Sequence, residues 1–339
     1  MKQYLLEPRP EGISALVLRD IEIPSPGPGE VTVRIAACSL NYRDLLVRSG
    51  KSASGGTNPV VPLSDGAGEI LSVGEEVTEW KTGDRVALTF FRDWISGRFD
   101  MVHHTSARGG SCDGVLAEVV LAPAHGLVRV PHSMSLEEAA TLPCAALTAW
   151  HALMERGNPV GPGDTVLCLG TGGVSLFALQ IAKAAGARVI LTSSSNEKAE
   201  RARALGADET INYRETPEWD REVGRLTEKR GADRVVEVGG PGTIERSMKS
   251  VSAGGVISLI GVLTGFAPPN TSLFPIVTKN AELHGIYVGN REMFVRMNDF
   301  LEAHRIRPVI DSVFGFDEVA AAYAHLESAT HFGKIIVAN

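Results

Sequence analysis

The sequence lacks several features that would assign it to a class at once. Only four of its 339 residues are cysteine, and their wide spacing argues against a disulfide framework. No apolar run approaches the roughly 18 residues that a membrane span needs. The first segment, MKQYLLEPRPEG, has neither the apolar stretch nor the small-residue cleavage site of an export signal. We therefore predict a cytoplasmic protein with no membrane partner.

Positive charge is also scarce. The chain has 33 basic and 40 acidic residues, a formal charge of -7, and its basic residues are scattered rather than clustered. Such a distribution offers no binding surface for nucleic acid. With 44% hydrophobic and 22% charged residues the composition is that of an ordinary globular protein, and the length favours two domains.

The pattern of apolar residues changes along the chain. The first third holds short strand-like runs, such as EVTVRIAACSL and GDRVALTF, that are bounded by turn residues. From about residue 134, helical periods alternate with short runs such as DTVLCLG and DRVVEVGG, which predicts βαβ units and a doubly wound parallel sheet. The last fifty residues predict two amphipathic helices and a strand that return to the first domain. Residues 92–113 show no period, and we predict a disordered surface loop or a lid there.

A glycine-rich turn follows the strand-like run VLCLG and precedes a long helical segment. Glycines in such a turn allow a tight bend and a close approach of a pyrophosphate, which the helix N-terminus also favours. Ser175 takes the place of the last glycine of the usual fingerprint, and we expect looser packing of the helix there. A purely structural turn is the alternative. The predicted dinucleotide contacts of this turn are Gly170, Thr171, Gly172, Gly173 and Val174.

The end of the next strand bears on the choice of dinucleotide. An acidic side chain there would bind the ribose 2′-hydroxyl of NAD, but the segment TSSSNEK has none before Glu197. Serine hydroxyls and a lysine would instead accept a 2′-phosphate, so we predict NADPH, with NADH as the alternative. Ser195 or Asn196 could also cap the following helix. The predicted contacts are Ser193, Ser194, Ser195 and Lys198.

The order of these segments resembles the medium-chain dehydrogenase/reductase superfamily over essentially the whole chain. The DGAGEI turn, the LPCAALTAW segment, the GTGGVS turn and the final FGKIIV follow its pattern. The segments SLNYRDLLVRSG and VPLSDGAGEI resemble its zinc-free, quinone-oxidoreductase-like branch, many of whose relatives carry alcohol dehydrogenase names. The resemblance implies an α/β fold with a GroES-like catalytic domain over residues 1–145, a Rossmann domain over 146–290, and a return to the catalytic domain over 291–339.

The same resemblance bears on metal binding. At the positions matching the catalytic zinc ligands, the chain has Asn41 for a cysteine and Ser64 for a histidine, with Asp65 for the glutamate that follows it. Only Cys144 matches a ligand, and it could also be a small core residue. The region that matches the structural zinc lobe has the single cysteine Cys112. We therefore predict no metal.

The absence of a catalytic metal would restrict the acceptors to which hydride can be transferred. Hydride addition to an isolated ketone places a full negative charge on one oxygen, which zinc stabilises, whereas a quinone or a conjugated carbonyl spreads that charge and needs only one or two donors. The predicted catalytic residues are Asn41 as the first donor, Tyr42 as the second, and Arg43 as a substrate or cofactor contact, with Asp44 orienting them. Alternatively, Asn41 caps a turn, Tyr42 packs, and Arg43 pairs with Asp44 or Asp65.

The resemblance implies further cofactor contacts. Thr148 matches a threonine near the nicotinamide, and Tyr213 matches a residue near the adenosine 2′-phosphate. Residues at the carboxyl ends of the later strands would line the ligand crevice, although their glycines could simply form tight turns. This group comprises Gly239, Gly261, Val262, Val288 and Gly289.

Together these observations predict an NADPH-dependent oxidoreductase that reduces a quinone, a conjugated carbonyl or an activated alkene. A zinc-independent alcohol dehydrogenase is the alternative enzyme, and an NADPH-binding structural or regulatory protein is the alternative of another class. Residues 51–58 and 92–113 are expected to contribute to the substrate pocket. The resemblance also implies a homodimer, for which ELHGIYVG would form the edge strand.

Overall fold

The computed structural model describes residues 1–9, 12–52, 58–267 and 271–339. It divides into two compact units, residues 1–147 with 288–339 and residues 148–287. The predicted divisions after residues 145 and 290 lie close to these bounds. Of the loop 51–58, residues 53–57 lie outside the described part of the chain.

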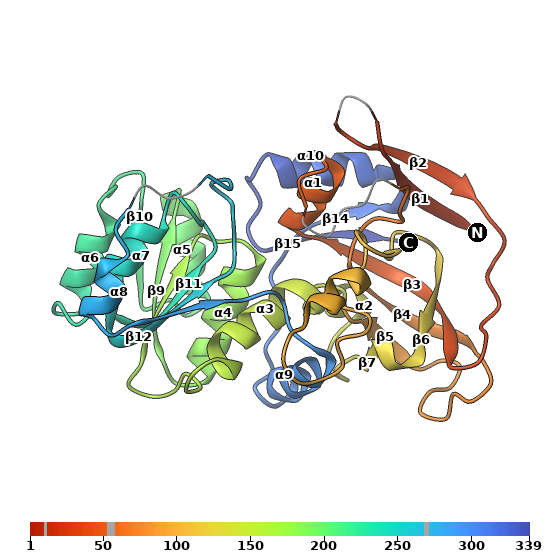
Figure 1. Cartoon of the computed structure of the whole chain (residues 1–339), viewed down its shortest axis with the longest axis horizontal. Helices are drawn as coiled ribbons and strands as arrows, with labels where there is room; N and C mark the ends of the chain where they lie inside the picture. The colour runs from red at the N-terminus through yellow and green to blue at the C-terminus, as the bar shows by residue number, and fades with distance from the viewer. Residues whose placement is uncertain (10–11, 53–57, 268–270) are drawn as a thin grey trace. The chain divides into compact units, whose positions relative to one another are not determined.

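The first unit is built on a seven-stranded sheet (Figure 1). Its longest strand, β3 (Glu30–Leu40), pairs antiparallel with β4 (Asp65–Val73), β6 (Val119–Pro123) and β15 (Lys334–Ala338). The sheet is completed by β5 (Arg85–Leu88), β7 (Leu127–Arg129) and β14 (Ile310–Gly315), and a separate two-stranded sheet pairs β1 (Lys2–Glu7) with β2 (Ala15–Asp20). The last strand of the chain is thus hydrogen-bonded to the third.

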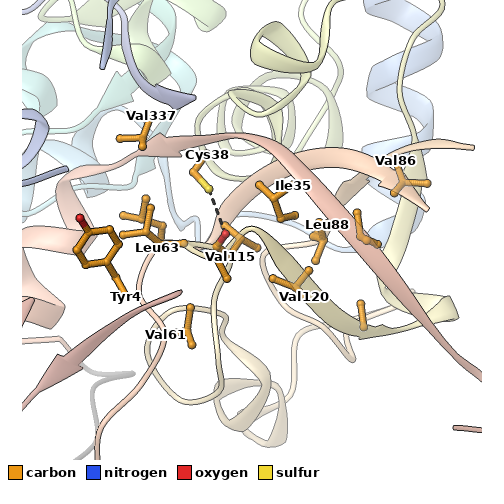
Figure 2. Close-up of a cluster of buried hydrophobic side chains, with 14 of the residues drawn as sticks. Tyr4, Ile35, Cys38, Val61, Leu63, Val86, Leu88, Val115, Val120 and Val337 are labelled. Atoms are coloured by element: carbon orange, nitrogen blue, oxygen red, sulfur yellow. Dashed lines mark hydrogen bonds between the residues drawn. The ribbon is translucent and has the colours of Figure 1, made fainter. Parts of the chain in front are cut away.

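Branched aliphatic side chains from several strands fill the core of this unit (Figure 2). Cys38 lies among them, completely buried, and its Sγ donates to the backbone oxygen of Val115 over 3.1 Å. Burial raises the pKa of the Cys38 thiol, so this residue behaves as a small apolar side chain rather than a nucleophile.

The prediction of disorder over residues 92–113 is wrong. Trp94 is buried and contacts the rings of Phe91 and Phe99 at 5.8 and 5.0 Å between centroids. A 3-10 helix, η1 (Met101–Ser106), then carries His103 over the Trp94 indole at 5.7 Å. Aromatic packing orders this segment without any helical or strand period, so the sequence pattern gave no sign of it.

The second unit is a doubly wound parallel sheet, as predicted. Its strand order is β10-β9-β8-β11-β12-β13, which is the 3-2-1-4-5-6 order of the dinucleotide-binding fold. The strands are β8 (Thr165–Leu169), β9 (Arg188–Ser193), β10 (Glu209–Asn212), β11 (Ala232–Glu237), β12 (Val251–Leu259) and β13 (Glu282–Gly285). The helices between them are α4 (Gly173–Ala184), α5 (Asn196–Ala204), α6 (Trp219–Leu226), α7 (Ile244–Ser250) and α8 (Phe274–Thr278).

The two predicted C-terminal helices are α9 (Arg291–Ala303) and α10 (Val319–Glu327). Each buries an apolar stripe, which in α9 includes Phe294, Met297 and Leu301. Among the described residues, none of the helices has the length and apolar character required to cross a membrane.

Candidate functional site

The glycine-rich turn joins β8 to α4 at the carboxyl edge of the parallel sheet. Gly170 adopts a left-handed backbone with φ of 77°, and a Cβ at Gly170 or Gly172 would meet no atom within 4 Å. Packing therefore does not require glycine at Gly172, and the space beside both residues is open. Open space at the N-terminus of a helix of 12 residues fits the approach of a diphosphate. The neighbouring Thr171 is buried and Val174 half-buried.

Ser175 has a definite role in this turn. Its side chain is 2% exposed, and its Oγ donates to the backbone oxygen of Leu169 over 2.6 Å. This bond joins the first turn of α4 to the last residue of β8. The serine thus replaces the usual glycine with a hydrogen bond between helix and strand, and the sequence analysis did not anticipate this compensation.

The serines after β9 form a compact turn. Ser195 caps α5, its Oγ accepting from the backbone nitrogen of Lys198 over 3.2 Å. Ser193 is buried, with its Oγ bonded to both backbone polar groups of Ser195. Its backbone oxygen accepts from the nitrogen of Tyr213 over 3.0 Å, which brings the exposed Tyr213 beside this turn. Capping of α5 by Ser195 is therefore confirmed, and Ser194 keeps a half-buried position next to it.

A carboxylate that the sequence analysis missed organises the next strand end. Glu237, the last residue of β11, is completely buried. Its Oε1 accepts from the backbone nitrogens of Gly239 and Gly240 over 2.7 and 2.9 Å and from Thr243 Oγ1 over 2.6 Å. Its Oε2 accepts from Ser247. Glu237 therefore fixes the turn between β11 and α7. The glutamate at the end of the apolar run DRVVE could have indicated this role from the sequence.

The remaining predicted cofactor contacts have varied surroundings. Thr148 is buried in α3 (Leu147–Trp150). A Cβ at Gly239 would lie 2.2 Å from Thr243 Oγ1, and one at Gly261 would lie 1.9 Å from the backbone oxygen of Val238. Close packing thus requires these two glycines regardless of any ligand. The last three predicted cofactor contacts are Val262, Val288 and Gly289. Val262 is half-buried in the second unit, whereas Val288 and Gly289 are buried in the first unit.

In the first unit, Asn41 shares a buried site with a lysine. Lys334, the first residue of β15, is only 3% exposed, and its Nζ donates to Asn41 Oδ1 and to the backbone oxygen of Leu40, each over 2.6 Å. Burial lowers the pKa of Lys334, whereas the charge of Asp65 opposes that change. Nothing in the FGKIIV segment of the sequence indicated that this ammonium group reaches Asn41.

Asp65 joins the other two positions that match zinc ligands. Its Oδ1 accepts from Ser64 Oγ over 2.7 Å, and its Oδ2 accepts from the backbone nitrogen of Cys144 over 3.0 Å. Burial raises the pKa of Asp65, and the ammonium of Lys334 is the largest influence that lowers it. The side-chain amide of Asn41 also lowers the pKa of Asp65. The Nδ2 atom of Asn41 nevertheless has no partner within the described chain that meets hydrogen-bond geometry. The described residues thus leave this buried Nδ2 donor without a well-placed acceptor.

The neighbouring residues hold Asn41 in place. The carboxylate of Asp44, 1% exposed, accepts from the backbone nitrogen of Asn41 over 2.8 Å at the start of α1 (Tyr42–Arg48). Arg43 donates to the backbone oxygen of Arg108 over 2.7 Å, lies over the ring of Phe90 and has an Nη1 3.7 Å from Asp44 Oδ1. Arg43 therefore has the structural role named as its alternative. Tyr42 is exposed on the first turn of α1.

These residues do not fit a tetrahedral zinc site. Asn41 Oδ1 already accepts from a lysine ammonium, whose charge would repel a divalent cation at the same position. Of the three positions that match zinc ligands, only Cys144 keeps a side chain that zinc ordinarily takes, because the other two are Asn41 and Ser64. Over the described ranges, no three His, Cys, Asp or Glu side chains are grouped as a set of metal ligands.

Two protein families match the chain. The alcohol dehydrogenase GroES-like domain matches residues 27–132, and the zinc-binding dehydrogenase family matches residues 173–303. Together these matches cover most of both units.

Several relatives are named as oxidoreductases, of more than one kind. A zinc-type alcohol dehydrogenase-like protein of Schizosaccharomyces pombe is 44% identical, over 99% of this chain and 98% of its own. A quinone oxidoreductase of Pseudomonas aeruginosa is 33% identical over 96% of each chain. A 2-methylene-furan-3-one reductase of Solanum lycopersicum is 32% identical, over 94% of this chain and 74% of its own. Among solved structures, an NAD-dependent alcohol dehydrogenase superposes over 100% of both chains with a TM-score of 0.88 at 33% identity.

Proposed function

Because the chain belongs to the medium-chain dehydrogenase/reductase superfamily, we propose that it is an NADPH-dependent oxidoreductase that transfers hydride to a quinone or to another conjugated carbonyl or alkene without a catalytic zinc ion. The observation that carries this proposal is the 2.6 Å contact between Lys334 Nζ and Asn41 Oδ1. The lysine supplies fixed positive charge at Asn41, one of the positions that match zinc ligands in the resemblance. A conjugated acceptor requires no stronger electrophile.

NADPH, when bound, supplies the hydride and its two electrons. The Asn41 amide would donate from Nδ2 to the acceptor's carbonyl oxygen. Its Oδ1 is held by Lys334, and this charge-assisted bond polarises the amide and makes its N–H a better donor. As hydride adds to the acceptor carbon, the displaced electron pair moves onto that oxygen through the conjugated system. A proton from solvent then completes the reduction.

The choice of NADPH depends on the turn after β9. No acidic residue occurs there before Glu197, and Ser194, Lys198 and Tyr213 belong to the same turn or its neighbour. A 2′-phosphate would meet hydroxyls and an ammonium group at the turn after β9. A carboxylate of the neighbouring turn, Glu215, accepts from the side-chain amide of Asn196 over 2.7 Å. The NAD-dependent relative named above favours the alternative, and kcat/KM measured with each cofactor decides between them.

One screen tests the reaction and the metal together. The purified chain, saturated with NADPH, is assayed against 1,4-benzoquinone, an enal, a simple ketone and, in reverse, a primary alcohol, while the zinc content of the same sample is determined. We expect the quinone or the enal to be reduced fastest by protein that holds substoichiometric zinc. Stoichiometric zinc whose chelation abolishes turnover would contradict the proposal, as would fastest turnover of the alcohol.

Alcohol oxidation is the second candidate. The zinc-type and alcohol dehydrogenase names of the relatives favour it, and the same screen distinguishes it from the first. Binding of NADPH without turnover of any acceptor would instead indicate a structural or regulatory protein.

We also propose that the chain is a homodimer joined through β13. This strand ends the parallel sheet in the strand order, and Glu282, Leu283 and Gly285 are exposed along it. An exposed strand edge carries unpaired backbone groups that a second copy can satisfy. Sedimentation analysis should show a dimer, and Leu283→Pro should give a monomer because proline removes a backbone donor from the strand.

A further inference from the structure

A buried arginine, for which the described part of the chain supplies no carboxylate within 4.0 Å, lines a cavity of the first unit. Arg108 is only 3% exposed, and within the described residues its Nε and Nη2 have no hydrogen-bond partner. It lines a cavity of about 550 Å³, a volume within the range of small-molecule sites. Burial lowers the pKa of Arg108 to about 10, so the guanidinium keeps its charge at neutral pH.

The backbone around Arg108 holds it in this position. Its carbonyl oxygen accepts from Arg43 Nη1 over 2.7 Å, and its nitrogen donates to the backbone oxygen of Phe90 over 3.0 Å. A buried cation whose N–H groups lack acceptors is costly, and an anionic ligand removes that cost. The planar guanidinium is suited to a carboxylate that binds it through both oxygens.

The other charges of the cavity limit the charge of the ligand. Arg92 is already paired with Asp93 through three N–H to oxygen contacts of 2.9 to 3.2 Å. Two carboxylates, Glu30 and Asp113, also line the cavity, each accepting from a backbone nitrogen. They would repel a dianion such as phosphate more strongly than an ion of single charge.

The wall of the cavity is partly apolar. Val60, Leu121 and Pro123 line it, and Leu121 is exposed although it lies in strand β6. Such a wall fits a hydrocarbon or aromatic group attached to the anion.

We propose that this cavity binds an organic monocarboxylate, with the carboxylate on the Arg108 guanidinium and its apolar body against Leu121. The site lies wholly within the first unit and is separate from the cluster of Asn41 and Lys334. It would therefore bind its ligand whether or not the proposed reaction is correct.

Isothermal titration calorimetry of the full chain with benzoate tests the proposal, with benzamide as a neutral control of the same shape and inorganic phosphate as a second anion. We expect benzoate to bind with a millimolar or lower Kd, about tenfold or more tightly than either control. Failure of benzoate to bind, equal binding of benzamide, or tighter binding of phosphate would each overturn the proposal.

Two variants locate the binding. Arg108→Lys keeps a positive charge but loses the planar fork, and should weaken benzoate binding about tenfold. Leu121→Trp should block the apolar wall and abolish binding, whereas Leu18→Trp, an exposed leucine on β2 outside the cavity, should bind as wild type does. Unchanged affinity in the folded Leu121→Trp protein would contradict the proposed site even if Arg108→Lys does not fold.

Discussion

The Nζ of Lys334 lies 2.6 Å from Oδ1 of Asn41 although the two residues are 293 positions apart in the chain. Strand β15 pairs with β3 so that Ile335 lies opposite Leu40, which places the lysine beside the residue that precedes α1. The ammonium group then stands among Asn41, Asp65 and Asp44, and its charge offsets that of the carboxylates. Pairing of a C-terminal strand with an N-terminal one thus assembles the polar site of the first unit.

The amide of Asn41 should be essential for the chemical step. Asn41→Asp keeps an oxygen for Lys334 but loses the Nδ2 donor, so we expect kcat with a quinone to fall about a hundredfold or more. Affinity for NADPH, measured by nucleotide fluorescence, should stay unchanged. A kcat close to that of wild type would show that the donor lies elsewhere, with Tyr42 as the next residue to test.

Lys334 should act through Asn41 rather than on the substrate. Lys334→Gln removes the charge that polarises the amide, and we expect kcat to fall about tenfold to a hundredfold with a much smaller change in KM. The variant also leaves Asp65 without its neighbouring cation. The pKa of that carboxyl should therefore rise, and because Asp65 shares the buried site with Asn41, any step in the pH profile of kcat that follows its ionisation should move to higher pH. An unchanged profile would argue that Lys334 serves stability alone.

Asp44 gives the protein a measurable dependence of stability on pH. Burial raises the pKa of Asp44 from 3.8 to about 6. The folded chain therefore binds more protons than the unfolded chain between these values, and the free energy of unfolding falls as pH rises through this window, by about 3 kcal/mol. Asp44→Asn should remove this contribution to the slope. Urea unfolding of both proteins at pH 4, 5, 6 and 7 measures the difference, and parallel curves would contradict the assignment.

The sequence predicted the second unit better than the first. Parallel strands alternating with helices have a clear period, and the glycines of GTGGVS mark one strand end, so the sheet and its ligand edge could be inferred. The partners of Asn41 could not be, because Lys334 reaches it only through long-range strand pairing. The segment around Trp94 likewise owes its order to aromatic contacts that have no sequence period. The role of Ser175 was also not predictable from the sequence pattern, because its hydrogen bond to Leu169, which compensates for the missing glycine, is seen only in the structure.

Cofactor preference should respond to one residue of the turn after β9. Ser194→Asp introduces a carboxylate beside the predicted 2′-phosphate, and kcat/KM for NADPH should fall about tenfold to a hundredfold while that for NADH changes little. Ser194→Asn, a neutral side chain of similar size, is the matched control and should retain the preference for NADPH. Equal losses with both cofactors in the aspartate variant would place the 2′-phosphate elsewhere.

The turn after β11 should depend on the charge of Glu237. Its carboxylate accepts from four groups, namely the backbone nitrogens of Gly239 and Gly240 and the hydroxyls of Thr243 and Ser247. Glu237→Gln replaces one acceptor oxygen with an N–H donor, so that buried donors face each other. We expect the free energy of unfolding to fall by about 3 kcal/mol.

The control for this change lies on the adjacent helix. Glu245 is exposed on α7, and among the described residues its one ion pair is with Lys249, four residues on, at 2.8 Å. Glu245→Gln should therefore cost less than about 0.5 kcal/mol. Urea unfolding of the two variants measures both effects, and NADPH titration shows whether the turn around Gly239 also contributes to cofactor affinity. A network of four charge-assisted bonds cannot be exchanged for an amide without a loss of stability. Equal, small losses of stability in both variants would therefore show that Glu237 is dispensable for ordering this turn.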